Sequence, residues 1–393
     1  MDYFEASLKR HRETRGKIEV RSRMRLDSVD DLSLAYTPGV ARPCEEIANN
    51  PAAAWDLTWK GRTVAVVSDG SAVLGLGNLG GLASLPVMEG KAALFREFGG
   101  VDAVPVVLAT QDEDEIIQAV RAIAPTFGGI NLEDISAPRC FRIEAALQDL
   151  GIPVLHDDQH GTAIVLLAAL MNATRITGVS MSNLSVVING AGAAGHAIAR
   201  MLCCQDEDDR CIPVGKVRIC DSKGIIAPSR AGLDEYKQRL ARWTNPEDEQ
   251  GDLRAALRGA HAFIGVSKGN LLTGDDIRCM AKDSIVLAMA NPTPEIMPAE
   301  AEAAGARIIG TGRSDFPNQV NNVLAFPGLF RGALAARAVK FTTAMKFAAV
   351  EAIAAAAGEP SPKRILPAAF DRSVAVSVAD RVAEAARQSG ACL

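Results

Sequence analysis

The sequence LSVVINGAGAAG at residues 184–195 decides the fold of this chain. Its apolar run predicts a strand over residues 184–189, and the glycines that follow open a helix. Gly190 permits a tight turn, Gly192 lets the backbone approach a pyrophosphate, and Gly195 permits close helix packing. The stretch predicts a dinucleotide site, with a ligand-free strand–helix turn as the alternative. The other residues of the predicted cofactor-binding turn are Ala191, Ala193 and Ala194.

Strands and helices alternate on both sides of this turn. Apolar runs predict strands at 63–67, 103–108, 127–132 and 153–155, and then at 184–189, 216–220, 262–266, 285–289 and 307–310. Helical stretches are predicted at 82–98, 112–124, 138–150 and from about Gly161. Alternation of this kind implies parallel βαβ units, so we predict an α/β fold. We expect an N-terminal parallel domain over 1–160 and a Rossmann-type domain with a helical tail over 161–393.

The composition is that of an ordinary globular protein. The 393 residues suffice for two full cores, and 48% are hydrophobic. A formal net charge of -5 and a pI of about 5.7 give little support for nucleic-acid binding. The N-terminus lacks an apolar signal core, and the run 163–171 is too short to span a bilayer. We therefore expect a cytoplasmic protein with neither nucleic-acid nor membrane partners.

Three local features have simple interpretations. Residues 9–25 are basic, which favours a solvated or subunit-contacting segment over an anion-binding arm. Eight cysteines show neither zinc-site nor redox-motif spacing, so free thiols in a reducing compartment are expected. The acidic stretch 203–214 is interpreted as a loop insertion.

Carboxylates stand at the ends of two predicted strands. They occur in NLED at 131–134 and in HDDQH at 156–160. In a parallel sheet these ends meet at one edge, where ligands collect. Each pair taken alone could cap a helix. Together, Glu133, Asp134 and Asp158 predict a site for Mg²⁺ or Mn²⁺, since uncompensated carboxylates so close would repel one another.

Lys91 falls inside an apolar helical stripe formed by Val87, Leu94, Phe95 and Phe98. Burial would lower the pKa of its ammonium group unless carboxylates compensate, and a neutral amine can act as a general base. A lysine that snorkels at the edge of the stripe is the alternative.

Weaker signals lie in four other places. Asp221 ends the strand after the glycine turn, where an acid accepts ribose hydroxyls and favours NAD, while Lys223 could meet a 2′-phosphate. Asn291 and Asn322 lie in loops and could orient a carboxylate or a carboxamide, although turn chemistry is the usual role. Tyr36 lies in an ordinary turn.

Taken together, the motifs of this chain resemble those of small bacterial members of the malic enzyme family. The matching stretches are SLAYTPGVARPC (33–44), DGSAVLGLGNLG (69–80), PVMEGKAALF (86–95), GGINLEDISAPRCF (128–141), HDDQHGTA (156–163), INGAGAAG (188–195), ANPTPEI (290–296) and GRSDFPNQVNNVLAFPGLFRGAL (312–334). Their order is that of the family and they cover nearly the whole chain. Several long motifs in register are far more specific than any one alone.

The resemblance implies oxidative decarboxylation of malate to pyruvate with NAD or NADP and with Mg²⁺ or Mn²⁺. Lys91 matches the general base, Tyr36 the proton donor and Asp157 a carboxylate beside the base. The implied metal ligands are Glu133, Asp134 and Asp158. Thr162 and Asn291 match cofactor-binding residues, and Asn291 and Asn322 match substrate-binding residues. Relatives of this kind form homodimers, so we expect a homodimer.

The chain departs from larger family members in one loop. Those members carry an arginine that grips a malate carboxylate, whereas residues 69–73 here read DGSAV. Backbone amides of residues 75–80 or Asn322 could serve instead. Two competing functions are a hydroxy-acid dehydrogenase that does not decarboxylate and a catalytically silent nucleotide-binding regulator.

Overall fold

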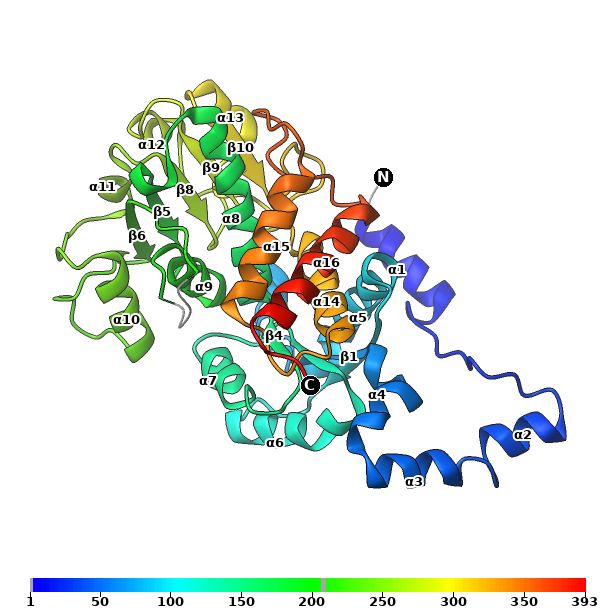
Figure 1. Cartoon of the computed structure of the whole chain (residues 1–393). Coiled ribbons are helices and arrows are strands. Elements are labelled where there is room, and N and C mark those ends of the chain that lie inside the picture. Colours follow the sequence, from blue (N-terminus) through cyan, green and yellow to red (C-terminus); the bar gives the residue numbers. More distant parts are fainter. Residues whose placement is uncertain (1–2, 206–209) are drawn as a thin grey trace.

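The computed structural model describes residues 3–205 and 210–393, and within them the strands form two sheets (Figure 1). The first sheet is parallel throughout, in the order β2-β1-β3-β4. Its strands are β1 (Thr63–Ser68), β2 (Asp102–Val107), β3 (Gly129–Leu132) and β4 (Val154–His156). The connecting helices are α5 (Gly81–Leu94), α6 (Glu113–Ile123) and α7 (Arg139–Ala146).

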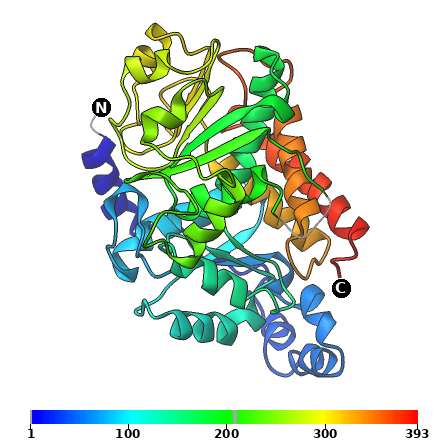
Figure 2. The same cartoon turned by 90° about the vertical axis from the view of Figure 1, so that its left-hand side faces the viewer.

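The second sheet has the order β10-β9-β8-β5-β6-β7 and crosses the centre of Figure 2. Its strands are β5 (Ser185–Asn189), β6 (Lys216–Asp221), β7 (Gly224–Ile225), β8 (Ala262–Gly265), β9 (Ile285–Ala288) and β10 (Ile308–Thr311). Its helices are α9 (Ala193–Leu202), α10 (Glu235–Thr244), α11 (Leu253–Leu257), α12 (Gly274–Arg278) and α13 (Pro298–Ala303). Only the short β7 is antiparallel, and it was not predicted because two residues give no periodic signal. The predicted parallel α/β fold is confirmed.

A single long helix, α8 (Asp157–Thr177), links the two sheets. It begins at Asp157 rather than near Gly161, so Asp157 and Asp158 form its first turn and His156 is its N-cap. The apolar stretch 163–171 is buried almost throughout, and it packs against α9 and α15. No helix in the described part of the chain is long and apolar enough to cross a membrane.

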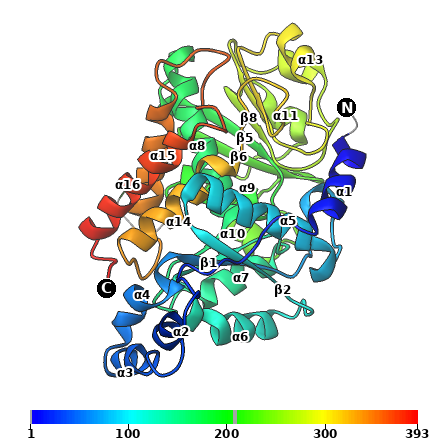
Figure 3. The ribbon, with the colours of Figure 1, turned by 90° about the vertical axis from the view of Figure 1, so that its right-hand side faces the viewer.

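The C-terminal tail forms three helices that pack on one another, and one of them, α15, also packs on α8 (Figure 3). They are α14 (Phe326–Ala335), α15 (Thr343–Ala356) and α16 (Arg372–Gln388). Gly328 and Gly332 let α14 approach α16 closely, since a Cβ at Gly328 would lie 2.6 Å from Val378 Cβ. Phe326 also contacts Phe95, in the π-helical η4 (Phe95–Gly99) that follows α5, at a centroid distance of 4.7 Å. As a result, one apolar cluster runs through both halves of the molecule.

The N-terminal segment stands apart from this core. Its helices α1 (Tyr3–Thr14), α2 (Val29–Ala35) and α3 (Ala41–Asn49) contain no buried residue. Figures 1 and 3 both show α2 and α3 projecting from the body of the molecule. Several large apolar side chains of the segment are exposed, among them Phe4, Val20, Met24, Val29 and Leu34.

Short elements connect these parts. They are η1 (Pro51–Ala53), α4 (Ala54–Leu57), η2 (Trp59–Arg62), η3 (Leu74–Leu76), the π-helical η4 (Phe95–Gly99), η5 (Ala124–Thr126), η6 (Met181–Asn183) and η7 (Asn322–Leu324).

The expectation of eight free thiols was wrong for one pair. Cys204 and Cys211 form a disulfide, and their Cα atoms are 5.5 Å apart, within the range that a disulfide spans. The other six cysteines are free. The spacing rules missed this pair because they search for metal and redox motifs. The predicted loop insertion at 203–214 includes residues 206–209, which lie outside the described residues.

Candidate active site

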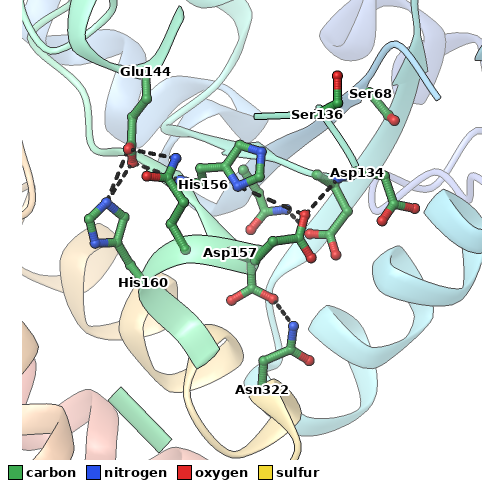
Figure 4. A network of polar contacts seen from close by, with 12 residues as sticks. Ser68, Asp134, Ser136, Glu144, His156, Asp157, His160 and Asn322 are labelled. Carbon is green, nitrogen blue, oxygen red and sulfur yellow. Dashed lines mark hydrogen bonds and ion pairs between the residues drawn. The ribbon is translucent and has the colours of Figure 1, made fainter. Parts of the chain in front are cut away.

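The three predicted metal ligands come together at the carboxyl edge of the first sheet. Glu133 and Asp134 follow β3, and Asp158 lies in the first turn of α8. One oxygen of each carboxylate lies within 4.8 Å of the others. The backbone N–H of Asp134 donates to Asp158 Oδ2 at 2.9 Å (Figure 4). Burial and the neighbouring Asp158 raise the pKa of Glu133.

This donor set fits a hard divalent cation. All three groups supply oxygen, as Mg²⁺ and Mn²⁺ prefer. Glu133 and Asp134 are buried, while Asp158 is partly open. The capping alternative is wrong for Glu133 and Asp134, because Pro138 is the N-cap of α7. Asp157 and Asp158 do not cap α8 either, since they lie within the helix.

Lys91 is fully integrated into this cluster. Its Nζ lies 2.6 Å from Asp157 Oδ2 and 2.8 Å from Glu133 Oε1, and 4.1 Å from the centroid of the Phe326 ring. The snorkelling alternative is therefore wrong, because the ammonium group is buried. Burial alone would lower the pKa of Lys91, but Asp157 and Glu133 outweigh it and raise the pKa above its ordinary value. The pKa of Lys91 is therefore set by its two carboxylate partners and not by the lowering that burial alone would cause.

Asp157 connects Lys91 to Asn322. Asp157 Oδ2 also accepts a hydrogen bond from Asn322 Nδ2 at 2.5 Å, whereas the buried Oδ1 has no partner. Burial raises the pKa of Asp157 to about 6 despite the nearby Lys91. A Cβ at Gly161 would lie 1.9 Å from Asp157 Oδ1. Gly161 is therefore a site residue that the sequence analysis treated only as the approximate start of a helix.

The nucleotide turn has the geometry that its glycines predict. Gly190 adopts φ 122°, and a Cβ there would lie 2.6 Å from the carbonyl oxygen of Val266. A Cβ at Gly195 would lie 1.8 Å from the carbonyl oxygen of Gly190. Gly192 faces open space at the start of α9, so its backbone is accessible to a ligand. This cradle, completed by Ala191, Ala193 and Ala194, suits a pyrophosphate.

Asp221 ends β6 beside this turn, but it is not a free carboxylate. Its Oδ2 accepts from Arg230 Nη2 at 2.5 Å and from Lys237 Nζ at 2.8 Å. Burial would raise the pKa of Asp221, but the hydrogen bonds from Arg230 and Lys237 lower it to about 2. Lys223 contributes its backbone N–H to Asp221 Oδ1, at 2.9 Å. The sequence pointed to Lys223 as the competing cation and missed Arg230 and Lys237.

Asn291 lies in the loop after β9. A Cβ at Gly75 would lie 2.4 Å from the carbonyl oxygen of Asn291, so the glycine-rich loop of the first half touches this loop. The buried Glu295 accepts from the backbone N–H groups of Ala290, at 3.0 Å, and Ser267, at 3.2 Å. No periodic or spacing signal identified Glu295.

Two predicted residues stand outside the cluster. Tyr36 ends α2 and is 67% exposed, and Figures 1 and 3 show α2 well away from α5. Thr162 lies half-buried in the second turn of α8. Within one chain, the structure brings together the lysine, the carboxylates and Asn322, but it does not bring Tyr36 to them.

A nucleotide-binding turn beside a buried lysine–carboxylate cluster is the arrangement of a dinucleotide-dependent oxidoreductase. Two family models match the chain. Residues 15–148 match the N-terminal domain of malic enzyme, and residues 159–387 match its NAD-binding domain.

Individual relatives agree with these models. The chain is 52% identical to the bifunctional malic/malolactic enzyme of Bacillus subtilis, over 99% of this chain and 94% of that one. It is 51% identical to the NAD-dependent malic enzyme of Geobacillus stearothermophilus, over 95% and 77%. The crystal structure of the NAD-dependent malic enzyme of Thermotoga maritima matches with a TM-score of 0.91 and 48% identity, over 96% and 98%. The chain therefore belongs to the malic enzyme family, and it is an NAD(P)-dependent malic enzyme.

Proposed function

We propose that this chain oxidises and decarboxylates (S)-malate to pyruvate and CO₂ while reducing NAD or NADP, and that it requires a divalent metal ion. The observation that carries the proposal is Lys91 held between Asp157 and Glu133, next to the other two metal-type carboxylates. The two relatives from Bacillus subtilis and Geobacillus stearothermophilus are malic enzymes, which supports the proposal.

Glu133, Asp134 and Asp158 would hold Mg²⁺ or Mn²⁺. A bound ion there supplies positive charge that lowers the pKa of a substrate hydroxyl and accepts electron density as CO₂ leaves. The nicotinamide of NAD(P) supplies the hydride acceptor. The partnerless, buried Asp157 Oδ1 leaves an acceptor open for a bound group in this cluster.

Within the chain, Lys91 is proposed as the base that takes the malate hydroxyl proton. It must first release a proton, and the carboxylate of Asp157, 2.6 Å away, is the neighbouring acceptor. Asn322 fixes the Asp157 carboxylate through its side-chain amide. Asn291 is proposed to orient substrate and nicotinamide from the loop after β9. Tyr36 is the proposed donor of the proton to carbon after CO₂ has left.

We also propose which part of the chain binds substrate and metal and which part binds the nucleotide. Residues 1–160 would bind substrate and metal, and residues 161–393 would bind NAD(P) through Thr162, the turn Gly190–Gly195 and Asp221. The extents of the two family matches support this division. NAD is the expected cofactor, because Asp221 is an acid at the ribose position. The cations Arg230 and Lys237 around it leave NADP usable.

The exposed N-terminal segment supports a homodimer. Tyr36 lies on α2, away from the helix α5 that carries Lys91 of the same chain, and the segment carries exposed apolar side chains. In the proposed two-fold dimer, Tyr36 of one subunit completes the site that holds Lys91 of the other.

Initial rates test the function directly. Purified enzyme is given malate and Mn²⁺ with either NAD or NADP, and pyruvate and reduced nucleotide are both measured. Equal amounts of pyruvate and reduced nucleotide are expected. Reduced nucleotide with accumulating oxaloacetate and no pyruvate would instead identify a dehydrogenase that does not decarboxylate.

A further inference from the structure

A cavity is lined by residues outside the proposed active site. Its volume is about 1060 Å³, and its walls come from α7, β4, the first turn of α8, α9, α10 and residues 340–346. None of the residues proposed for catalysis, metal binding or nucleotide binding lines it. The volume reaches the upper end of the range for small-molecule sites, so an organic anion or a phosphate ester fits.

Most of the charged side chains that line this cavity are basic. Only Glu144 and Glu235 are acidic, against five basic side chains, namely Arg142, Arg200, Arg239, Lys340 and Lys346. Arg142 pairs with Glu113 and Asp114 outside the cavity, and Arg239 lies 3.7 Å from Glu235, so positive charge remains in excess after this pairing. Glu144 is buried, and its carboxylate is hydrogen-bonded to the backbone N–H of His156 and to the ring of His160. A cleft with such an excess of one charge raises the local concentration of ions of the opposite sign. The cavity therefore favours an anionic ligand.

His196 supplies a second, independent sign of a ligand. It lines the cavity from α9, only 7% of it is exposed, and its Nε2 has no hydrogen-bond partner. Its ring is held by Phe141, at a centroid distance of 4.5 Å, and by Trp243, at 5.3 Å. A buried polar atom without a partner costs free energy, which a ligand oxygen at Nε2 would recover.

One residue of the cavity wall, Glu144, also contacts the start of α8, the helix that carries Asp157 and Asp158. Glu144 accepts from the backbone N–H of His156 at 2.9 Å and pairs with His160 Nε2 at 3.0 Å (Figure 4). His160 Nδ1 lies 3.1 Å from Lys346 Nζ. His156 is the N-cap of α8 and has no side-chain cap of its own, so Glu144 supplies the anionic cap from α7. Asp157 and Asp158 are the next two residues.

We propose that this cavity is an effector site for a phosphate-bearing anion, which binds the basic rim and Nε2 of His196. The bound anion changes turnover through the Glu144–His160 contact that positions the first turn of α8. The binding part of the proposal does not depend on the malate chemistry, whereas the effector part rests on the proposed function.

Calorimetry tests the binding part. Metal-free enzyme saturated with NAD is titrated with inorganic pyrophosphate, so that the nucleotide site is already filled. One saturable site per chain is expected. Arg239→Gln and Lys340→Gln, on exposed side chains, should each weaken binding about tenfold, the value of one lost charge-assisted contact. Arg254→Gln, an exposed cation on α11 that pairs with Asp276 outside the cavity, is the matched control. Absence of binding, or equal binding by all variants, would overturn the site.

Kinetics test the effector part. Inorganic phosphate should change kcat or the KM for malate in wild-type enzyme and in Arg254→Gln, and it should do so much less in Arg239→Gln. Basal rates without phosphate should be alike in all three. If pyrophosphate binding is lost in Arg239→Gln while phosphate changes no rate in wild-type enzyme, the cavity binds anions but does not act as an effector site. An enzyme without any malate turnover would refute the proposed function and leave the calorimetric result standing.

Discussion

The ammonium group of Lys91 lies 2.6 Å from the carboxylate of Asp157, and both side chains are buried. A buried ion pair of this kind is destabilised strongly when one partner is removed, because the other is left without a counter-charge. Variants of the pair must therefore be compared for folding as well as for rate.

Lys91→Ala should abolish malate oxidation, with a loss on the order of 10²–10⁴ in kcat, since it removes the proposed base. NAD affinity, measured by calorimetry, should stay close to wild type, and small amines should restore part of the activity. Lys282→Ala, on an exposed loop, is the control. A folded Lys91→Ala enzyme that keeps more than about half of the wild-type kcat would make Lys91 a structural lysine.

Mn²⁺ should stabilise the wild-type enzyme against heat, because an ion that binds only the folded state adds about 2.7 kcal/mol at one hundred times its Kd. Asp158→Asn and Glu133→Gln should raise the Mn²⁺ concentration needed for this effect and for turnover. Asp149→Asn, at an exposed carboxylate that pairs with Arg121, should change neither. Full activity of the wild-type enzyme after verified metal removal would contradict the metal site.

Asp221→Asn should raise kcat/KM for NADP relative to that for NAD. The substitution removes the carboxylate and leaves Arg230 and Lys237, which now pair with it, to meet a 2′-phosphate. Wild-type enzyme should favour NAD. If wild-type kcat/KM is already tenfold higher for NADP, the cations rather than Asp221 decide cofactor choice.

Mixing Tyr36→Phe with Lys91→Ala should restore activity as subunits exchange. In the proposed dimer, a mixed pair has one site with both defects and one intact site. Subunit exchange is followed by native mass measurement. If exchange is complete and activity does not recover, then Tyr36 and Lys91 serve the same subunit's site.

The metal-free protein should lose stability as the pH falls from about 6.5 to about 4. Burial, together with Arg200 and Arg239, lowers the pKa of His196 from its ordinary 6.5 to about 4. In this window the unfolded chain binds a proton that the folded chain does not, so acid favours unfolding. His196→Leu should reduce this loss, as measured by urea unfolding at each pH. An unchanged pH dependence would show that His196 does not contribute.

The sequence predicted the parallel strands well, because each is an apolar run bounded by turn residues, as in β1 and β5. It also placed Glu133, Asp134 and Asp158 at one edge, since parallel strands share their carboxyl ends. The sequence placed the start of α8 four residues too late, near Gly161. The reason is that Asp157 and Asp158 are polar and lie before the apolar residues from which the helix was predicted.

Contacts between distant segments could not be predicted. Arg230 and Lys237 reach Asp221 only after the chain folds back through α10, and Glu144 reaches His156 from α7. For Lys91, the sequence predicted burial and the family resemblance implied Asp157 beside it, but neither predicted that Glu133 also contacts the ammonium group, and the two carboxylates together raise its pKa. The position of Tyr36 relative to Lys91 depends on an N-terminal segment with little apolar periodicity to fix it.

The continuous apolar cluster around α8 has a consequence for recombining this enzyme with its relatives. A chimaera joined within α8 would combine the catalytic first turn of one parent with a helix body packed against α9 and α15 of the other. Mismatched volumes at so buried a junction would cost stability in both halves at once. Exchange of cofactor preference between relatives is therefore better sought by grafting the exposed strand-end loops than by swapping whole halves.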